Sequence, residues 1–316
     1  MAKVGIIGLG NIFDKTKDIL FNIPDFEITA LCDMSQDRLK EYEGKLFTTT
    51  DYAELLDKCD VVMISTPPKT HYPIAKFFME KGKDVIVEKP LTMSPQELKS
   101  FKELREKGGN FYSLLHYSFG KEIVWWKEHG KEFGVPNKIV AVFDDPYYAS
   151  GQLDAHAVGL GGAYIDSTIN SLSGIYRLYP GKLEAKGRKL RMDPKTNVDI
   201  YANSKYEINF GGKKIDVDVT INWDCQEKMK GIYLYYPDRT ILLDGHEQTV
   251  IDCDRTQGVL YQGEGTRMLN HYEGMLNEYT QIKDNFDFSY NLHRAILENM
   301  RDKKAQKQKD GADREL

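Results

Sequence analysis

Three short segments of the chain combine residue types that can hold a nucleotide and move a proton. Residues 8–13 read Gly-Leu-Gly-Asn-Ile-Phe, residues 64–71 read Ile-Ser-Thr-Pro-Pro-Lys-Thr-His, and residues 85–90 read Val-Ile-Val-Glu-Lys-Pro. Each segment follows, or itself begins with, a short apolar run of the kind that forms a buried parallel strand. Because ligands bind at the carboxyl ends of strands in open parallel sheets, we expect the three segments to share one edge of a sheet.

The glycine-rich segment predicts a dinucleotide site. Gly8 and Gly10 let the backbone approach a pyrophosphate, which is attracted by the N-terminus of a helix that opens at Asn11 and Ile12. Phe13 stands where this fingerprint normally has a third glycine, so we expect the helix to lie slightly away from the sheet. Phosphate approach depends on the first two glycines only.

An acidic residue completes the dinucleotide signature. Asp33 ends the next predicted strand, where a carboxylate accepts hydrogen bonds from both ribose hydroxyls and repels a 2′-phosphate. Taken alone, Asp33 is equally well explained as a helix-capping residue. Its register with the glycines favours the ligand, and NAD is the expected cofactor. NADP stays open as an alternative because Ser35 and Arg38 follow closely.

The first 120 residues alternate strand and helix signals, which predicts a doubly wound parallel sheet. Capping residues at 94–97 mark one helix start. The expected strands are residues 3–7, 28–32, 61–65, 85–87 and 111–115, and the expected helices are 11–22, 35–45, 51–58, 71–81 and 94–107.

After residue 120 the pattern changes. A Gly-Gly turn precedes a helix at 163–178, and closely spaced strands follow from 182 to 262; parallel pairing needs long crossovers, so we expect them to be antiparallel. Helices at 267–283 and 289–303 finish the chain. The expected fold class is α/β, with a Rossmann domain at 1–120 and, at 121–316, an α+β domain with a large, mostly antiparallel sheet. This second domain would bind substrate and mediate oligomerisation, and its last helices can pack back on the first.

Together these motifs resemble the glucose–fructose oxidoreductase / inositol dehydrogenase family (Gfo/Idh/MocA) over essentially the whole chain. The resemblance rests on the Gly8–Gly10 turn, the Thr-Pro-Pro loop ending at His71, the Glu-Lys-Pro segment, and Gly161-Gly162 followed by Asp166. It implies that the lysine of the Glu-Lys-Pro segment lies beside the nicotinamide and the reacting hydroxyl. It also implies a set of further cofactor contacts: Ser65, Thr66, Pro67, His71 and Glu88.

Lys89 is the expected proton acceptor of this segment. Loss of water in a cleft and the nearby cationic nicotinamide both favour the neutral amine, which can take a proton from an alcohol as hydride leaves. The alternative is an ordinary surface lysine in a loop after a strand. The flanking apolar strand and the resemblance favour the catalytic interpretation.

The helix at 163–178 carries a second polar pair. Asp166 and Asn170 are four residues apart and share one face of this helix; Asp166 can alternatively just offset the helix dipole. Many family members have histidine where Asn170 stands, and an amide cannot shuttle a proton. With His116 after the last parallel strand, this pattern resembles the aldose 1-dehydrogenase branch, which implies that Asn170, His116 and Asp144 contact the sugar.

Several of these assignments have alternatives. Asp145 is an equal choice for the acidic sugar contact, and that branch usually has glutamate there. His116 and His271 can each be core residues. The aromatics Tyr147, Tyr148 and Trp223 can stack on a sugar or pack within the sheet.

Composition excludes several other classes of protein. Of 316 residues, 41% are hydrophobic and 29% charged, and a net charge of −5 predicts no nucleic-acid partner and no anionic membrane surface. The sequence shows no signal peptide and no long apolar run, and its four cysteines lack metal-ligand spacing. We therefore expect a cytoplasmic protein without a metal.

The resulting hypothesis is an NAD-dependent dehydrogenase that oxidises an aldose at C1 to the lactone. Lys89 and Asp166 are the candidate proton acceptors. Two alternatives remain: a polyol or inositol dehydrogenase or sugar-ketone reductase of the same family, and a nicotinamide-binding sensor without turnover. The long sheet exceeds what two helices can cover, so we expect a homodimer or homotetramer through that sheet.

Overall fold

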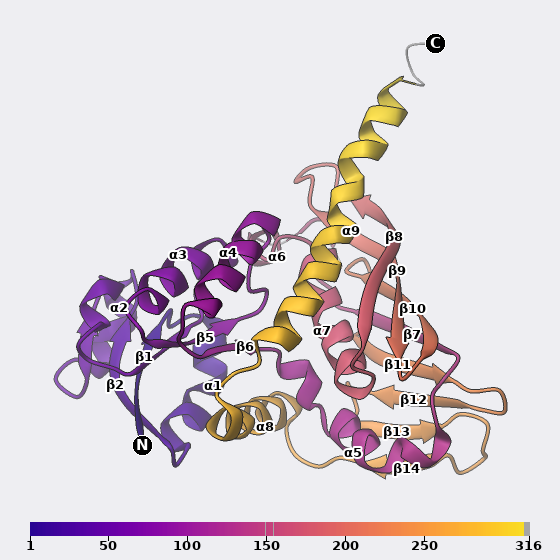
Figure 1. The fold of residues 1–316 in the computed structure, drawn as a ribbon, viewed down its shortest axis with the longest axis horizontal. Coiled ribbons are helices and arrows are strands. Elements are labelled where there is room, and N and C mark those ends of the chain that lie inside the picture. The colour runs from indigo at the N-terminus through magenta and orange to yellow at the C-terminus, as the bar shows by residue number, and fades with distance from the viewer. Residues whose placement is uncertain (149, 154, 313–316) are drawn as a thin grey trace. The chain divides into compact units, whose positions relative to one another are not determined.

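The computed structural model describes residues 1–148, 150–153 and 155–312 (Figure 1). The chain divides into two compact units: unit 1 is Met1–Phe119 with Gly265–Tyr290, and unit 2 is Gly120–Glu264 with the residues from Asn291 onward. The segment 265–290 thus belongs to unit 1 although the C-terminal part of the sequence supplies it. In the described part, no helix has the length and apolarity to cross a membrane, and no cluster of His, Cys, Asp and Glu could hold a metal.

Unit 1 is built on a parallel sheet of six strands in the order β3-β2-β1-β4-β5-β6. The order reverses direction at β1, which creates the crevice in which ligands bind in doubly wound sheets. The strands are β1 (Ala2–Ile7), β2 (Phe26–Cys32), β3 (Phe47–Thr49), β4 (Val61–Ile64), β5 (Asp84–Glu88) and β6 (Phe111–Leu114). Their near-continuous apolar runs are buried because helices cover both faces.

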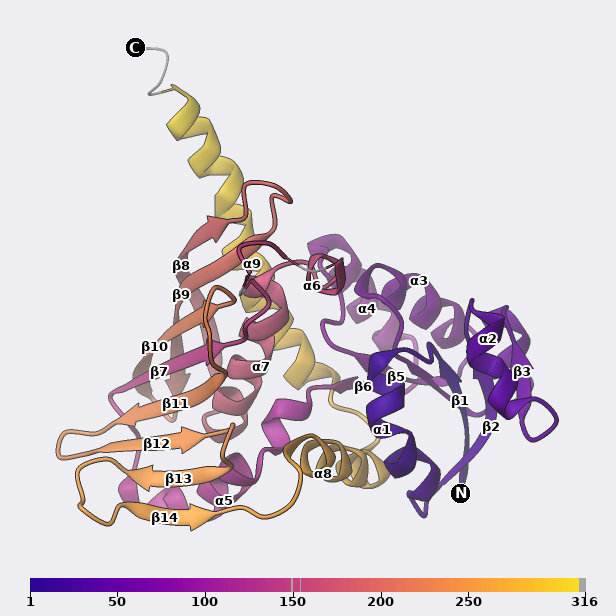
Figure 2. The same ribbon diagram turned by 180° about the vertical axis from the view of Figure 1, so that it is seen from behind.

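The helices of unit 1 lie on the two faces of this sheet. Two of them, α3 (Pro68–Met79) and α4 (Pro95–Glu106), cover one face, and α1 (Asn11–Asn22) and α8 (Arg267–Ile282) cover the other (Figures 1 and 2). Helix α8 is held by contacts such as Tyr112 Oη donating to the Met275 carbonyl at 3.1 Å. Two of the expected helices are shorter: 35–45 splits into α2 (Gln36–Leu39) and a 3₁₀ turn, and 51–58 is a 3₁₀ turn at Tyr52–Leu55.

Unit 2 is built on an eight-stranded sheet in the order β14-β13-β12-β11-β7-β10-β9-β8. Consecutive strands pair antiparallel as expected, but β7 and β10 are parallel, which the long connection between them permits. The sheet is therefore mixed. Its strands are β7 (Lys138–Asp144), β8 (Lys182–Met192), β9 (Asp199–Phe210), β10 (Lys213–Asn222), β11 (Met229–Tyr235), β12 (Thr240–Asp244), β13 (Thr249–Asp252) and β14 (Val259–Gln262).

Helix α7 (Ala163–Leu178) packs on one face of this sheet, against β7, β9 and β10. Alternation along β10 fits this arrangement: Ile215, Val217, Val219 and Ile221 are buried, while the residues between them are exposed or half-buried. The remaining helices of unit 2 are α5 (Lys121–His129), α6 (Ala155–Gly159) and most of α9 (Phe286–Ala312).

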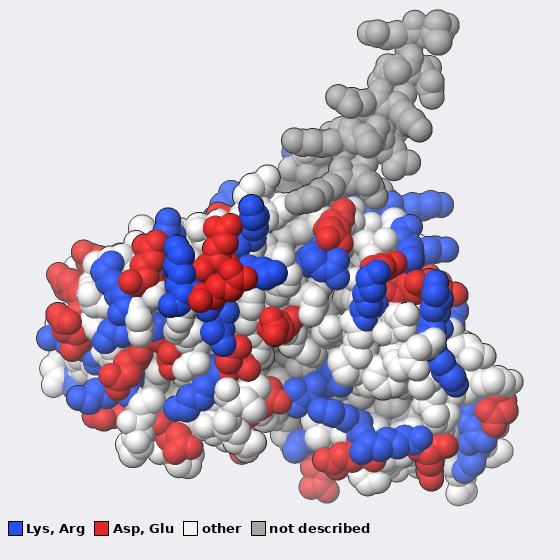
Figure 3. All heavy atoms as spheres, viewed as in Figure 1, with Lys and Arg blue, Asp and Glu red and all other residues white. Residues whose placement is uncertain are grey.

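The surface carries charges of both signs. Figure 3 shows lysine and arginine side chains interspersed with aspartate and glutamate over the face in view. The formal net charge of −5 is spread in the same way, so this face offers no broad region of one sign.

Candidate active site

The turn after β1 is shaped by contact with the turn after β4. Gly8 has φ +94°, and a Cβ built there would lie 2.8 Å from the backbone carbon and oxygen of Ser65. The Ser65 hydroxyl donates a hydrogen bond of 2.7 Å to the Gly8 carbonyl. Gly10 differs, because a Cβ there would meet nothing within 4 Å. The space in front of Gly10 and the first N–H groups of α1, at Asn11 and Ile12, fit a pyrophosphate.

Asp33 holds this turn from the end of β2. Its two carboxylate oxygens accept hydrogen bonds from the backbone N–H groups of Leu9 at 2.7 Å and Ser35 at 2.8 Å. Each oxygen keeps a second lone pair for a ribose hydroxyl. Arg38, the residue that would favour NADP, pairs with Asp14 at 2.7 Å.

Phe13 replaces the third glycine by packing into the core. Its side chain is 2% exposed, and its ring meets the ring of Tyr42 edge-on at 6.0 Å. The first turn of α1 therefore has an apolar anchor, and the nucleotide loop keeps both functional glycines.

The two glycines give a matched pair of substitutions. Gly8→Ala should destabilise the protein and abolish NAD binding, since its methyl group collides with backbone at a positive φ. Gly10→Ala should leave the unfolding midpoint within a few degrees of wild type and weaken NAD by about tenfold or more, because its methyl group occupies the open phosphate space. Thermal unfolding and NAD titration check both. Tight NAD binding by Gly10→Ala would contradict this phosphate site.

His71 joins the loop after β4 to the loop after β5. Its Nδ1 lies 2.9 Å from the Pro90 carbonyl and its Nε2 lies 2.7 Å from the Thr66 carbonyl. Burial lowers the pKa of His71, so the ring is neutral at physiological pH and donates to one carbonyl only. Both ring nitrogens are turned to backbone, so His71 positions these loops. Thr66 is tied to helix α3 by the Thr70 hydroxyl at 2.7 Å, and Pro67 caps that helix.

Lys89 is fixed through Glu88 and a tyrosine from α8. The Lys89 backbone N–H donates to Glu88 Oε2 at 3.0 Å, and the Tyr272 hydroxyl donates a short hydrogen bond to Glu88 Oε1. Glu88 is 5% exposed and Tyr272 fully buried. Nothing local in the sequence indicates Tyr272, because the pair is 184 residues apart.

Tyr272→Phe should separate positioning from folding at this point. The variant keeps the ring in the core but leaves a buried Glu88 oxygen without its donor, which costs about 1–3 kcal/mol of unfolding free energy. We expect kcat to fall and the Kd for NAD to change little, since Glu88 orients Lys89. Urea unfolding, steady-state kinetics and NAD titration test this; unchanged kcat would remove Tyr272 from the site.

His116 begins the 3₁₀ turn His116–Phe119 after β6 and contacts α8 as well. Its Nδ1 lies 3.1 Å from Nδ1 of His271, and its ring stacks on Tyr272 with centroids 5.4 Å apart. Both histidines are buried, at 8% and 0% exposure. The expectation that His271 is a core residue is correct, and it also touches a candidate site residue.

In unit 2, the Gly-Gly turn places Asp166 and Asn170 on α7 through a distant aspartate. Asp199 accepts a hydrogen bond of 2.6 Å from the Tyr164 backbone N–H, and a Cβ on Gly162 would collide with this carboxylate at 2.4 Å. Asp166 is 6% exposed. The Asn170 Oδ1 atom is buried and has no hydrogen-bond partner among the described residues.

The end of β7 carries two aspartates with different roles. Asp145 forms a short ion pair with Lys230, and these side chains are only 13% and 7% exposed. Asp144 is half-buried, and its carboxylate accepts no hydrogen bond within the described chain. Burial raises the pKa of Asp144, while Lys230 opposes this rise and Asp145 adds to it. Asp144 is thus the available acidic contact, and Asp145 is occupied.

The aromatic candidates divide. Trp223 is fully buried, and its Nε1 donates to the Ser167 hydroxyl at 3.4 Å, so it packs within the unit and cannot stack on a sugar. Tyr147 meets it edge-on at 5.0 Å, and the Tyr148 hydroxyl donates to Asp193 at 3.2 Å. These contacts hold the loop after β7.

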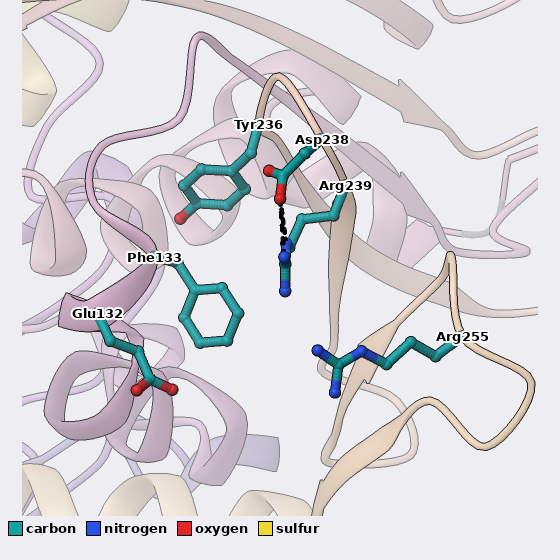
Figure 4. A pocket seen from close by; sticks show the side chains of 6 residues that line it. All are labelled: Glu132, Phe133, Tyr236, Asp238, Arg239 and Arg255. Atoms are coloured by element: carbon teal, nitrogen blue, oxygen red, sulfur yellow. Dashed lines mark hydrogen bonds and ion pairs between the residues drawn. The ribbon is translucent and has the colours of Figure 1, made fainter.

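A second cavity of about 330 Å³ lies at the opposite end of β11 from Asp144. Six residues separate those strand ends, or roughly 20 Å. The side chains of Arg239 and Arg255 point into it, facing Phe133 (Figure 4). Arg255 Nε contacts the buried Asp252 at 3.0 Å, and Arg239 pairs with Asp238 at 2.7 Å. The cavity is lined by Glu132, Phe133, Tyr236, Asp238, Arg239 and Arg255. Its arginines are already neutralised by carboxylates, so it offers an anion no excess positive charge.

Comparison with known proteins identifies the N-terminal part of the chain. Residues 2–116 match the family GFO_IDH_MocA, described as "Oxidoreductase family, NAD-binding Rossmann fold". A "Glycosyl hydrolase family 109 protein" of Streptomyces filamentosus is 33% identical over 120 residues, which cover 34% of this chain and 24% of that protein. The "Glucose-6-phosphate 3-dehydrogenase" of Bacillus subtilis is 28% identical over 141 residues, covering 41% of this chain and 40% of that protein.

The fold as a whole also has solved counterparts. KijD10, a 3-ketoreductase from Actinomadura kijaniata solved with TDP-benzene and NADP, superposes with a TM-score of 0.77 at 18% identity, covering 95% of this chain and 97% of that one. The sequence matches to curated relatives span well under two thirds of those relatives' length. The glycine turn, Asp33 and the loops after β4 and β5 all lie within the matched segment. The chain therefore belongs to the Gfo/Idh/MocA oxidoreductase family, and its residues 2–116 form that family's NAD-binding Rossmann fold.

Proposed function

We propose that the protein is a sugar dehydrogenase that oxidises a cyclic aldose at C1 to the lactone with NAD. The main support is the position of Lys89 at the end of β5, two strands from the Gly8 turn at the end of β1. Adjacent strands are about 4.8 Å apart, so some 10 Å separates the two strand ends. That is a suitable separation for a lysine that acts beside a nicotinamide whose phosphates bind at the turn.

The chemistry assigns a small number of tasks to the chain's residues. Bound NAD would supply the hydride acceptor. As the C1–H bond breaks and the C1–O double bond forms, the anomeric hydroxyl loses a proton, which Lys89 or Asp166 accepts. Asn170 has no acid–base function, which leaves these two residues as the proton acceptors of the proposal.

The same proposal assigns sugar positioning to three polar residues. The buried Oδ1 of Asn170 is an acceptor without a donor in the described chain, and a ring hydroxyl would satisfy it. Asp144 offers a carboxylate that is not used by another side chain, in contrast to Asp145. His116 offers a ring nitrogen. Holding a ring by several hydroxyls orients its C1–H bond, which lowers the entropic barrier to hydride transfer.

A second candidate reaction is oxidation at C3 of the sugar ring. It is favoured by the name of the Bacillus relative, a glucose-6-phosphate 3-dehydrogenase, and by the 3-ketoreductase among the structures of the same fold. The same loops and Lys89 would serve either carbon. Polyol or inositol oxidation and cofactor sensing without turnover are further alternatives.

The deciding experiment measures NAD and NADP reduction with a panel of aldoses, sugar phosphates, polyols and inositols. For each active aldose, the 1,5-anhydro analogue, which lacks the C1 hydroxyl but keeps that at C3, serves as the matched control. C1 oxidation predicts no turnover of the analogue and a lactone product by NMR. Turnover of the analogue would transfer the assignment to C3. NAD binding without turnover of any compound would favour the sensor.

We further propose that the protein forms a homodimer or homotetramer through the sheet of unit 2. Helix α7 covers one face only, and the other face of the central strands presents half-buried side chains such as Val140, Val142, Tyr233 and Leu242. A second copy would remove this mixed apolar face from water. Light scattering should give twice or four times the 36.3 kDa chain mass. A monomer at micromolar concentration would contradict the proposal.

A further inference from the structure

Two buried histidines in unit 1 share one hydrogen bond. The Nδ1 atoms of His116 and His271 are 3.1 Å apart, and the side chains are 8% and 0% exposed. A hydrogen bond between two such nitrogens needs a proton on one and a lone pair on the other. The direction of this bond therefore fixes the tautomer of both neutral rings.

The other ring nitrogen of His271 limits the choice. Its Nε2 is buried and has no hydrogen-bond partner among the described residues. Burial, assisted by the positive charge of Arg267, lowers the pKa of His271 to about 3, so this ring is neutral at physiological pH. Each of the two arrangements contains one ring of each tautomer, so the intrinsic preference of imidazole cancels.

The environment of Nε2 then decides between the arrangements. If His271 accepts at Nδ1, its proton sits on Nε2 as a buried N–H with no acceptor and close to the cationic Arg267. If His271 donates from Nδ1, its Nε2 carries a lone pair, which the positive charge of Arg267 stabilises. The second arrangement avoids the orphaned donor.

We propose that His271 is a positioning residue that donates from Nδ1 to His116 and holds His116 in the Nε2–H tautomer. This inference rests on the proposed function for its consequence: His116 meets a sugar oxygen as a hydrogen-bond donor and not as a proton acceptor. Proton removal is then left to Lys89 or Asp166. The family resemblance gives His116 a substrate contact but says nothing of its tautomer or of His271.

Neighbouring rings keep the two histidines in this orientation. Tyr272 stacks on His116 with an interplanar angle of 16°, and Tyr117 meets His271 edge-on at 5.4 Å. Tyr272 is itself held by Glu88. A flip of either ring would disturb this packing, so one tautomer should persist through substrate binding.

The direct test is ¹⁵N NMR of the imidazole rings in the wild-type protein near neutral pH. Variants His271→Asn and His116→Asn assign the signals. We expect a pyrrole-type Nε2 and pyridine-type Nδ1 for His116, and the reverse for His271. The opposite pattern, or a protonated imidazolium at His116, would overturn the proposal. This readout needs no substrate, so it remains decisive even if the proposed reaction is wrong.

A kinetic test uses a conservative and a disruptive variant. Asparagine at 271 retains an N–H donor near the position of Nδ1, whereas leucine removes it. We expect His271→Asn to keep kcat/KM for the sugar within about threefold, and His271→Leu to lose roughly tenfold, mostly through KM for the sugar, with KM for NAD unchanged.

The control is His246→Leu, at an exposed turn between β12 and β13, which should have no effect. Equal losses in both His271 variants, or an unaffected leucine variant, would contradict the positioning role. If the leucine variant fails to fold, the wild-type NMR pattern still decides the tautomer. Absence of turnover by wild type would count against the proposed function alone.

Discussion

Replacing Lys89 with alanine is expected to lower kcat by about 100- to 10,000-fold, the range that a general base contributes. Binding of NAD should persist, because the Gly8 turn and Asp33 make that site without the lysine side chain. Stopped-flow or steady-state NAD reduction with the best sugar of the panel measures the first quantity, and fluorescence titration measures the second. A variant with full turnover would remove Lys89 from the mechanism.

Two companion variants separate proton transfer from charge. Lys89→Arg keeps the positive charge but cannot accept a proton, since guanidinium stays protonated. It should be as impaired as alanine if Lys89 is the base, and largely active if only charge matters. In the latter case Asp166→Asn should carry the large loss. Lys99→Ala, on the exposed surface of α4, is the control and should behave as wild type.

Lys230→Met is expected to destabilise the protein by about 3–5 kcal/mol of unfolding free energy, because it leaves a buried Asp145 carboxylate without its cation. The two side chains are 7% and 13% exposed, so water replaces the lost partner poorly. Urea unfolding with unchanged slope would give this value directly.

The double variant Lys230→Met, Asp145→Leu provides the matched test. It removes both charges and should recover much of the lost stability, since a buried pair replaced by apolar groups is often nearly neutral. Lys138→Met breaks a more exposed pair with Asp218 in the same sheet and should cost less than about 1 kcal/mol. A single Lys230 variant as stable as that control would contradict a buried, mutually dependent pair.

Local sequence determined the nucleotide-binding half of the protein. The strand and helix periods, the Gly8–Gly10 turn and Asp33 are all set within 33 residues, and the structure confirms their arrangement at the end of β1 and β2. The capped helix α4 and the Gly-Gly start of α7 were predictable for the same reason, because caps and positive-φ turns depend on nearby backbone. Helix 35–45 was overestimated, since its polar residues had no extended apolar stripe to bury.

The tertiary structure alone decided which residues support those motifs. Tyr272 reaches Glu88 across 184 residues, His271 reaches His116 across 155, and Lys230 reaches Asp145 across 85. No periodicity or spacing encodes such pairs, because each depends on how separate elements pack. For the same reason only packing could show that Asp145 is occupied, that Asp144 is available, and that Trp223 is buried. The sequence thus determined where a nucleotide and a proton acceptor belong, while burial and long-range hydrogen bonds decided how those groups are held.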